Sequence, residues 1–199
     1  MMGFDYPTIA HSRRHGPAGY SSYESYREWL RDEFLFRCVF CLHREQWYNR
    51  GGSFHIDHFV PVSIDDKGTC EYDNLLYVCA ACNEAKKAVL GLPDPCQVSF
   101  AECLRIVESG QVEALNKVGE KLRQTLLLNS QRNVAYRSRL MRILDALSKS
   151  DPILYAEMMA FPTDLPDLRK KKASTNTRPE GVLTCFFVLR ENQLLAATY

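Results

Sequence analysis

Metal-binding side chains gather in one stretch of the sequence. Two Cys-x-x-Cys pairs, Cys38/Cys41 and Cys79/Cys82, stand 37 residues apart. Two thiolates in a tight turn can share one ion, and two such turns complete the tetrahedral coordination typical of structural zinc. Four cysteines would fill the coordination sphere and leave no place for a catalytic water, so we expect a structural Zn²⁺ site.

The gap between the two pairs is longer than the usual zinc-ribbon spacing. The pairs therefore bracket an inserted structure. The alternatives are two unrelated pairs or a redox motif, but a redox motif would follow a strand in a βαβ pattern, which the sequence lacks. The other four cysteines are scattered: Cys70, Cys96, Cys103 and Cys185.

The bracketed segment predicts two strands followed by a helix. Apolar and polar residues alternate over 54–60, which favours a strand with His55, Asp57 and Phe59 on one face. Leu75 to Val78 is a second short apolar run, and residues 80–90 can form a helix. Polar groups would converge between the hairpin and the helix start, as in a ββα unit.

Three sequence motifs in residues 38–90 resemble the HNH endonuclease family. They are His55-Ile56-Asp57-His58-Phe59-Val60-Pro61, then Asp73-Asn74-Leu75, then Cys79-Ala80-Ala81-Cys82-Asn83-Glu84-Ala85-Lys86-Lys87. The Asp-His pair alone would be a weak signal. It becomes specific because both cysteine pairs, the internal Asn and the residue after the last Cys follow in the family's order.

The resemblance implies a role for each polar residue of the motif. His58 would be the general base that deprotonates a water, and Asp57 would hold a divalent ion, Mg²⁺ or Mn²⁺. Asn83, where the family often has His, would be a second ligand, and its oxygen favours a hard cation. Asn74 would pin the hairpin loop and orient His58, and His55 would be a third ligand or an orienting residue.

The activity implied by this resemblance is metal-dependent hydrolysis of DNA, leaving 5′-phosphate and 3′-hydroxyl ends. Each residue also has a plain structural interpretation. His58 could be a strand histidine satisfied by a backbone carbonyl, and Asp57 a surface carboxylate. Asn74 could be a turn residue, Asn83 an ordinary helix residue and His55 incidental.

Basic residues near the motif are candidates for contact with nucleic acid. Lys86 and Lys87 follow Asn83 by three and four residues on the helix, and Arg37 and Arg44 flank the first cysteine pair. Such contacts with phosphates give affinity without sequence choice. The net charge is only +1, so any attraction for nucleic acid must be local.

The whole chain predicts an α+β protein with a small zinc-stabilised ββα-metal core and a mainly helical accessory region. Residues 1–20 read as a flexible arm and 21–92 as the nuclease domain. Apolar stripes over 97–161, including Phe100, Leu104 and Val107, predict a helical bundle. Residues 165–181 read as a basic flexible linker, and 182–199 as an apolar tail that could form a β-hairpin.

The sequence also bears on location and partners. No signal peptide and no run long enough to cross a membrane is visible, so we expect a cytoplasmic protein. The partner would be DNA, and the apolar tail favours a protein partner or self-association. Two other functions stay open: a nuclease subunit active only with a partner, as in a defence or restriction system, and a zinc-dependent module that binds nucleic acid without cutting it.

Overall fold

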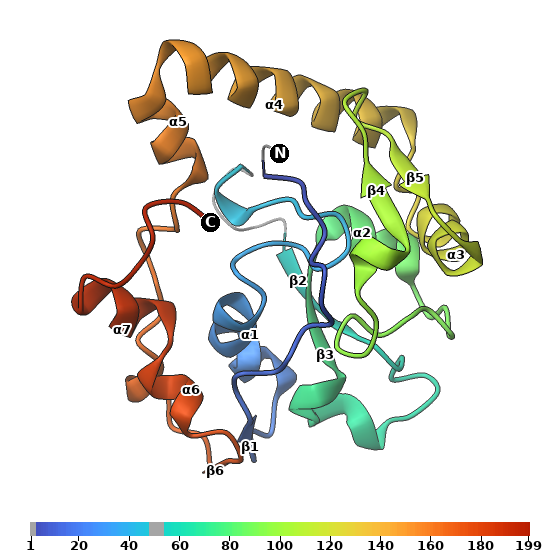
Figure 1. The fold of residues 1–199 in the computed structure, drawn as a ribbon. Helices are drawn as coiled ribbons and strands as arrows, with labels where there is room; N and C mark the ends of the chain where they lie inside the picture. The colour runs from blue at the N-terminus through green and yellow to red at the C-terminus, as the bar shows by residue number, and fades with distance from the viewer. Residues whose placement is uncertain (1–2, 48–53) are drawn as a thin grey trace.

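A two-stranded hairpin and the helix that follows it lie near the centre of the computed structural model, which describes residues 3–47 and 54–199 (Figure 1). Strand β2 (Phe54–His58) pairs antiparallel with β3 (Leu75–Cys79), from Phe54 opposite Cys79 to His58 opposite Leu75. The chain then passes directly into α2 (Ala80–Lys86). This confirms the predicted order of strand, strand and helix, although the helix ends before residue 90 because Lys87 adopts φ 48°.

Helix α1 (Arg27–Glu33) delivers the chain to the first cysteine pair. A 3₁₀ turn at Tyr23–Tyr26 precedes it, and its apolar residues Trp29 and Leu30 are fully buried beside β3. Leu35 and Phe36 then adopt left-handed backbone angles and turn the chain towards Cys38.

The predicted all-helical bundle over 97–161 is wrong in its first part. Residues there form a hairpin of β4 (Leu104–Ile106) and β5 (Val112–Ala114), joined through Gly110 at φ 82°. Phe100, Leu104 and Val107 fit the spacing of a helix. In the structure, Leu104 and Ile106 are buried and Arg105 between them is exposed, which is the alternation of a strand.

The second part of this region is helical, as predicted. Its helices are α3 (Lys117–Thr125), α4 (Gln131–Ser150) and α5 (Pro152–Met159). Helix α4 runs along one side of the molecule and α5 turns back towards the core (Figure 1). Among the described residues, no helix has both the length and the apolar character that crossing a membrane requires.

The segments predicted to be a flexible arm and a flexible linker contact each other within the described residues. Strand β1 (Pro17–Ala18) pairs with β6 (Thr175–Asn176), which joins the predicted arm to the predicted linker. The proposed β-hairpin of the tail is wrong, because α6 (Glu180–Leu183) and α7 (Phe186–Glu191) are helices. Phe186 and Val188, part of the apolar run that favoured an external partner, are buried within the chain itself.

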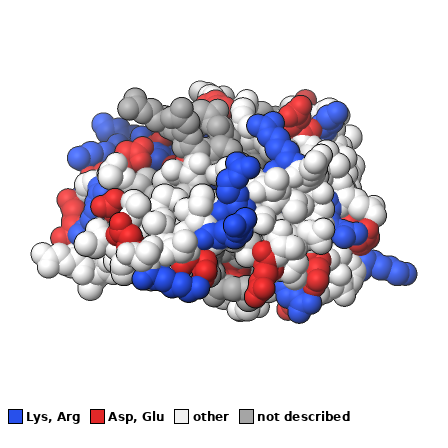
Figure 2. Space-filling view, turned by 90° about the horizontal axis from the view of Figure 1, so that it is seen from above, with Lys and Arg blue, Asp and Glu red and all other residues white. Residues whose placement is uncertain are grey.

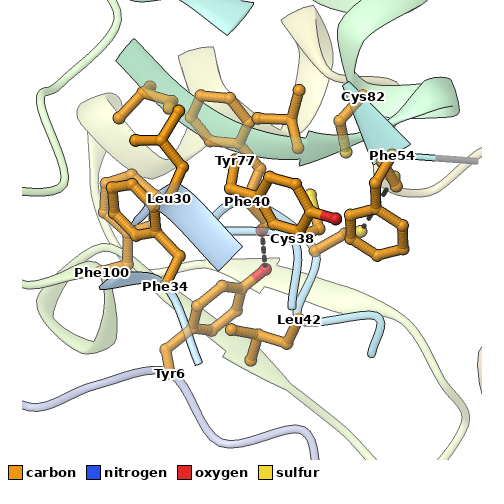
Figure 3. Close-up of a cluster of buried hydrophobic side chains, with 14 of the residues drawn as sticks. Tyr6, Leu30, Phe34, Cys38, Phe40, Leu42, Phe54, Tyr77, Cys82 and Phe100 are labelled. Atoms are coloured by element: carbon orange, nitrogen blue, oxygen red, sulfur yellow. Dashed lines mark hydrogen bonds between the residues drawn. The ribbon is translucent and has the colours of Figure 1, made fainter. Parts of the chain in front are cut away.

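One hydrophobic cluster runs through the molecule, with members from Phe4 to Val188. Aromatic rings from distant segments meet in it, as Figure 3 shows for Tyr6, Phe40 and Phe100. The Tyr6 hydroxyl donates a hydrogen bond of 3.0 Å to the carbonyl of Phe40, so the N-terminal segment is tied to the first cysteine turn. A second, smaller cluster joins Phe36 to Leu165 and Phe186.

Two adjacent carboxylates at the end of α1 bind segments from the N-terminal and C-terminal parts of the chain. Asp32 accepts hydrogen bonds from Arg14, from the His15 ring at 2.8 Å and from the backbone N–H of Phe186 at 2.8 Å. Glu33 accepts from the His11 ring at 2.8 Å and from the Tyr72 hydroxyl at 3.0 Å. Both carboxylates are fully buried, so their hydrogen bonds are needed to offset the cost of burial. This network joins the predicted arm and the predicted tail to the end of α1.

We expect Glu33→Gln to destabilise the protein in a pH-dependent way. Burial alone raises the pKa of Glu33, but the hydrogen bond from His11 and the charge of His15 outweigh it and lower the pKa to about 2. A depressed carboxylate pKa gives stability that is full above the ordinary value near 4.5 and is lost as the pH falls towards 2. The loss at neutral pH should be about 3 kcal/mol.

Urea unfolding of both proteins at neutral and acidic pH measures this effect. The difference in the free energy of unfolding between wild type and Glu33→Gln should shrink as the pH falls from about 4.5 towards 2. Glu24→Gln, which removes an exposed partner of Arg27, is the matched control and should change stability by less than about 1 kcal/mol. A pH-independent gap for Glu33→Gln would contradict the assignment.

Candidate metal and phosphodiesterase site

The two cysteine pairs come together in one buried cluster. The sulfur atoms of Cys38, Cys41, Cys79 and Cys82 all lie within 4.8 Å of one another. The first pair sits in a turn closed by the N–H of Leu42, which donates to the carbonyl of Cys38. The second pair is placed by the junction of β3 and α2, because Cys79 ends the strand and Cys82 lies in the helix.

The chemistry of this cluster fits a bound metal ion. Hydrogen bonds from the other three cysteines lower the pKa of Cys79 far below its usual range. The hydrogen bond with Cys38 is the largest factor raising the pKa of both Cys41 and Cys82. Four buried sulfurs can all become thiolates only when a cation joins them, and four thiolates are a common ligand set of structural zinc.

A second polar site lies at the end of β2, beside α2. A cavity of about 250 Å³ opens there, lined by Ile56, Asp57, His58, Pro61, Val62, Asn83 and Lys87. The end of β2 supplies Asp57 and His58, α2 supplies Asn83, and Lys87 follows directly after α2. Three of the predicted chemical residues, Asp57, His58 and Asn83, therefore line the same space.

The His58 ring is held in one tautomer. Its Nε2 atom lies 3.0 Å from the carbonyl oxygen of Thr69, and a carbonyl can only accept, so Nε2 must carry the proton. The neutral ring then has its lone pair on Nδ1, the atom that could take a proton from a water. The Tyr23 ring packs edge-on at 4.9 Å and fixes the plane of the imidazole.

Asp57 is buried, and its carboxylate faces a lysine ammonium group. Lys86 Nζ lies 2.9 Å from Oδ2 and 3.2 Å from Oδ1, and it donates to the backbone carbonyl of His58 at 2.7 Å. Apart from this ion pair with Lys86, Oδ2 has no hydrogen-bond partner among the described residues. Burial raises the pKa of Asp57, and the charges of Lys86 and His58 oppose the rise. A buried carboxylate oxygen with an unused lone pair is a suitable ligand for a hard cation.

Asn83 is half-buried and shares the cavity with Asp57. Its backbone carbonyl closes the helix by accepting from the N–H of Lys87. Its side-chain amide makes no hydrogen bond within residues 3–47 and 54–199, so its oxygen is available as a ligand.

The predicted third ligand, His55, is placed differently. It precedes Ile56 on β2, pairs with Val78 across the hairpin and is exposed. It does not line the cavity that holds Asp57 and His58. The structure therefore gives no support for His55 as a ligand.

Asn74 holds the long loop between the two strands. Its Oδ1 accepts the N–H of Val60 at 2.8 Å, and its Nδ2 donates to the carbonyls of Val60 and Gly68, each at 3.1 Å. These bonds fix the segment just beyond His58 and the turn that leads to Thr69. The two neighbours of Asn74 in the sequence are also held. Arg13 donates to the Leu75 carbonyl at 2.7 Å, and Arg178 donates to the Asp73 carboxylate at 3.0 Å.

We expect Asn74→Ala to loosen this loop without removing any group that lines the cavity. Three hydrogen bonds disappear, and the half-buried partners left unpaired should cost about 1–3 kcal/mol of stability. Any hydrolytic activity should fall because the Thr69 carbonyl no longer fixes the His58 ring. Hydrogen exchange of the Val60 amide measures the loosening, and unchanged protection there would contradict the role given to Asn74.

Two of the four predicted nucleic-acid contacts are wrong. Lys86 is fully buried against Asp57, and Arg44 is 1% exposed, with its guanidinium donating to the Met159 carbonyl and stacked 3.9 Å from the Tyr199 ring centre. Arg37 is half-buried and lines a different cavity, beside Arg14 and Phe186. Only Lys87 is both exposed and at the Asp57 cavity.

Three features of the site were missed by sequence reasoning. They are the Thr69 carbonyl that sets the His58 tautomer, the Tyr23 ring beside it, and the pairing of Lys86 with Asp57. The first two depend on loop geometry and carry no sequence signal. The third had a signal, because Lys86 lies one helical turn beyond Asn83 and could have been read as facing the same pocket.

Residues 38–88 match the HNH endonuclease family. The matched segment begins at Cys38, ends two residues beyond Lys86, and contains both cysteine pairs, the β2–β3 hairpin and α2. The match confirms the resemblance seen in the motifs and implies a nuclease-type activity. No curated protein and no solved structure matched the chain in the other two comparisons.

Proposed function

We propose that this protein is a divalent-metal-dependent endonuclease that hydrolyses phosphodiester bonds in DNA. The observation that carries the proposal is the meeting of His58, Asp57 and Asn83 around one cavity within the HNH-matched segment. Hydrolysis of a phosphodiester needs a base for the water, stabilisation of the added negative charge and help for the leaving oxygen. In this proposal His58 is the base for the water. Asp57 and Asn83 hold a metal ion that stabilises the negative charge and helps the leaving oxygen.

His58 is the general base in this proposal. Its Nε2 proton is committed to the Thr69 carbonyl, so Nδ1 can accept the proton of the attacking water. The carbonyl contact also stabilises the ring after it becomes charged, because a positively charged donor makes a stronger hydrogen bond. Asn74 acts indirectly by holding the loop that carries this carbonyl.

Asp57 and Asn83 would hold the divalent ion, Mg²⁺ or Mn²⁺, through Asp57 Oδ2 and the Asn83 side-chain oxygen. When bound, such an ion supplies positive charge to the phosphate oxygens and lowers the energy of the leaving alkoxide. Two oxygen ligands from the protein leave room for water and phosphate oxygens, which is the usual arrangement around Mg²⁺.

The four cysteines bind a structural zinc in this proposal. Cys79 ends β3, the partner strand of His58, and Cys82 lies next to Asn83. Zinc at the cysteines therefore fixes the angle between hairpin and helix on which the spacing of Asp57 and Asn83 depends.

DNA is the proposed substrate, and its phosphates would be attracted locally. Lys87 stands at the cavity, and Arg132, Arg139 and Arg142 are exposed on α4. Figure 2 looks onto the α4 side and shows Lys and Arg interspersed with Asp and Glu. Contacts of this scattered kind favour backbone binding with little sequence choice.

Cleavage assays on matched DNA and RNA test the substrate assignment. Purified zinc-loaded protein with Mg²⁺ should convert supercoiled plasmid to nicked or linear forms, and leave an RNA of similar length intact. The products should carry 5′-phosphate ends that a ligase can seal. Faster cleavage of RNA would contradict the DNA assignment, and binding without cleavage across several metals would favour the non-cleaving or partner-dependent alternatives.

A further inference from the structure

Lys86 is a fully buried cation that lies against Asp57, one of the residues that line the candidate pocket. Its ammonium group contacts both oxygens of Asp57, at 2.9 and 3.2 Å, and the carbonyl of His58 at 2.7 Å. The side chain is 1% exposed, and it comes from the last residue of α2, one turn after Asn83. The lysine is thus fixed beside the carboxylate that is proposed to hold the divalent ion.

The pocket holds little negative charge. Asp57 is the only carboxylate among the described residues that line it, and Lys87 adds a positive charge at the rim. Over the described ranges, the four cysteines form the only group of three or more Cys, His, Asp or Glu arranged to hold a metal. The described part of the pocket therefore offers a doubly charged ion only one carboxylate, and that carboxylate is already paired with a cation.

Two consequences follow from electrostatics. Lys86 and a divalent ion compete for the same carboxylate charge, and they repel each other in a buried setting where screening is weak. A phosphate group entering the pocket would add negative charge, offset the repulsion between Lys86 and the divalent ion, and so favour binding of the ion. Coupling of this kind is reciprocal, so the metal would strengthen phosphate binding by the same factor.

We propose that Lys86 is a positioning residue that makes the binding of the divalent ion depend on the presence of a nucleic-acid phosphate. The lysine holds Asp57 and the end of β2 in place while the pocket is empty of substrate. It also keeps the affinity for the free ion low, so the complete site forms only on DNA. This inference rests on the proposed function.

Titration with Mn²⁺, followed by electron paramagnetic resonance of the free ion, tests the inference without an activity readout. Zinc-loaded wild type is titrated alone and with a short DNA duplex that carries phosphorothioate linkages. The duplex should tighten Mn²⁺ binding by about tenfold or more, equivalent to about 1.4 kcal/mol. Equal affinity with and without the duplex would overturn the proposal, and this arm requires no variant.

Lys86→Met removes the charge and keeps the length of the side chain. Without DNA it should bind Mn²⁺ about tenfold more tightly than wild type, and it should gain less from the duplex. A lysine with only a structural role would give the opposite result, because loss of its contacts would loosen Asp57 and weaken binding. Lys87→Met is the matched control, since its exposed charge is screened and should change Mn²⁺ affinity by less than about threefold.

Asp57→Asn separates this inference from the proposed function. Unchanged Mn²⁺ binding by Asp57→Asn would mean that the proposed metal site is wrong. Loss of Mn²⁺ binding by Asp57→Asn, together with weaker or unchanged binding by a folded Lys86→Met, would overturn the role of Lys86 alone. Zinc content and thermal melting establish the folding of each variant.

Discussion

His58→Ala should abolish cleavage while leaving the protein folded. Positioned general bases contribute about 10²–10⁴-fold to rate, so the single-turnover rate on plasmid DNA should fall by at least about 10²-fold. The ring is half-buried, with a single hydrogen bond to the Thr69 carbonyl and an edge contact with Tyr23. Its removal should therefore leave the zinc content unchanged and lower stability only modestly.

His55→Ala is the matched control for this variant. It removes the same side chain from the same strand, but from an exposed position outside the cavity. Its cleavage rate should stay within about threefold of wild type, since surface substitutions away from a site have small effects. Equal losses in the two variants would contradict the assignment of His58, and a loss in His55→Ala alone would restore the ligand role that the sequence suggested.

Cys79→Ser should remove the structural zinc and with it most of the stability of the site. Structural zinc sites contribute apparent binding energies of about 10–16 kcal/mol in small domains at neutral pH. Only part of this energy should be lost from the stability of the protein here, because the large apolar core includes other segments that also stabilise the fold. We expect less than half of the wild-type zinc content, by atomic absorption, and a clear drop in melting temperature.

The effect of Cys79→Ser should extend to the pocket of Asp57, His58 and Asn83. Cys79 joins β3 to α2, so loss of the metal frees the helix that carries Asn83 and Lys86. Cleavage should be lost together with the zinc. Cys96→Ser, at a half-buried thiol outside the cluster, should keep both. Full zinc content in folded Cys79→Ser would contradict the four-cysteine site.

The segment that matches the HNH family, residues 38–88, could be predicted from sequence because its signals are local and mutually consistent. Alternation over Phe54–His58, the apolar run from Leu75 and the two cysteine pairs each specify one element, and their order matches a known family. The predicted four-cysteine cluster also formed as expected.

The hairpin of β4 and β5 could not be separated from a helix by pattern alone. Each strand has three residues, too few to show a period, and Phe100, Leu104 and Val107 also fit helical spacing. The tail was misread for a different reason. Its aromatic and β-branched run favours a strand, but Asp32 accepts the N–H of Phe186 and tertiary burial of Phe186 and Val188 selects a helix.

The roles of the charged residues depended on three-dimensional context. Lys86 and Arg44 have the residue type of phosphate contacts, and nothing local shows that both are buried. Lys86 is buried because α2 ends at this residue and packs its last turn against the end of β2. Arg44 is buried because the C-terminal Tyr199 returns to cover it, a contact between residues 155 positions apart.

Metal-dependent cleavage by wild type beside Asp57→Asn is the measurement that tests the central claim most directly. Both proteins are matched for zinc content, and Mg²⁺ is added or omitted rather than chelated, because a chelator would also strip the cysteine site. We predict that wild type cuts plasmid DNA only with Mg²⁺ and that Asp57→Asn cuts neither with nor without it. Undiminished, Mg²⁺-dependent cutting by Asp57→Asn would show that the chemistry does not occur in the pocket of Asp57, His58 and Asn83.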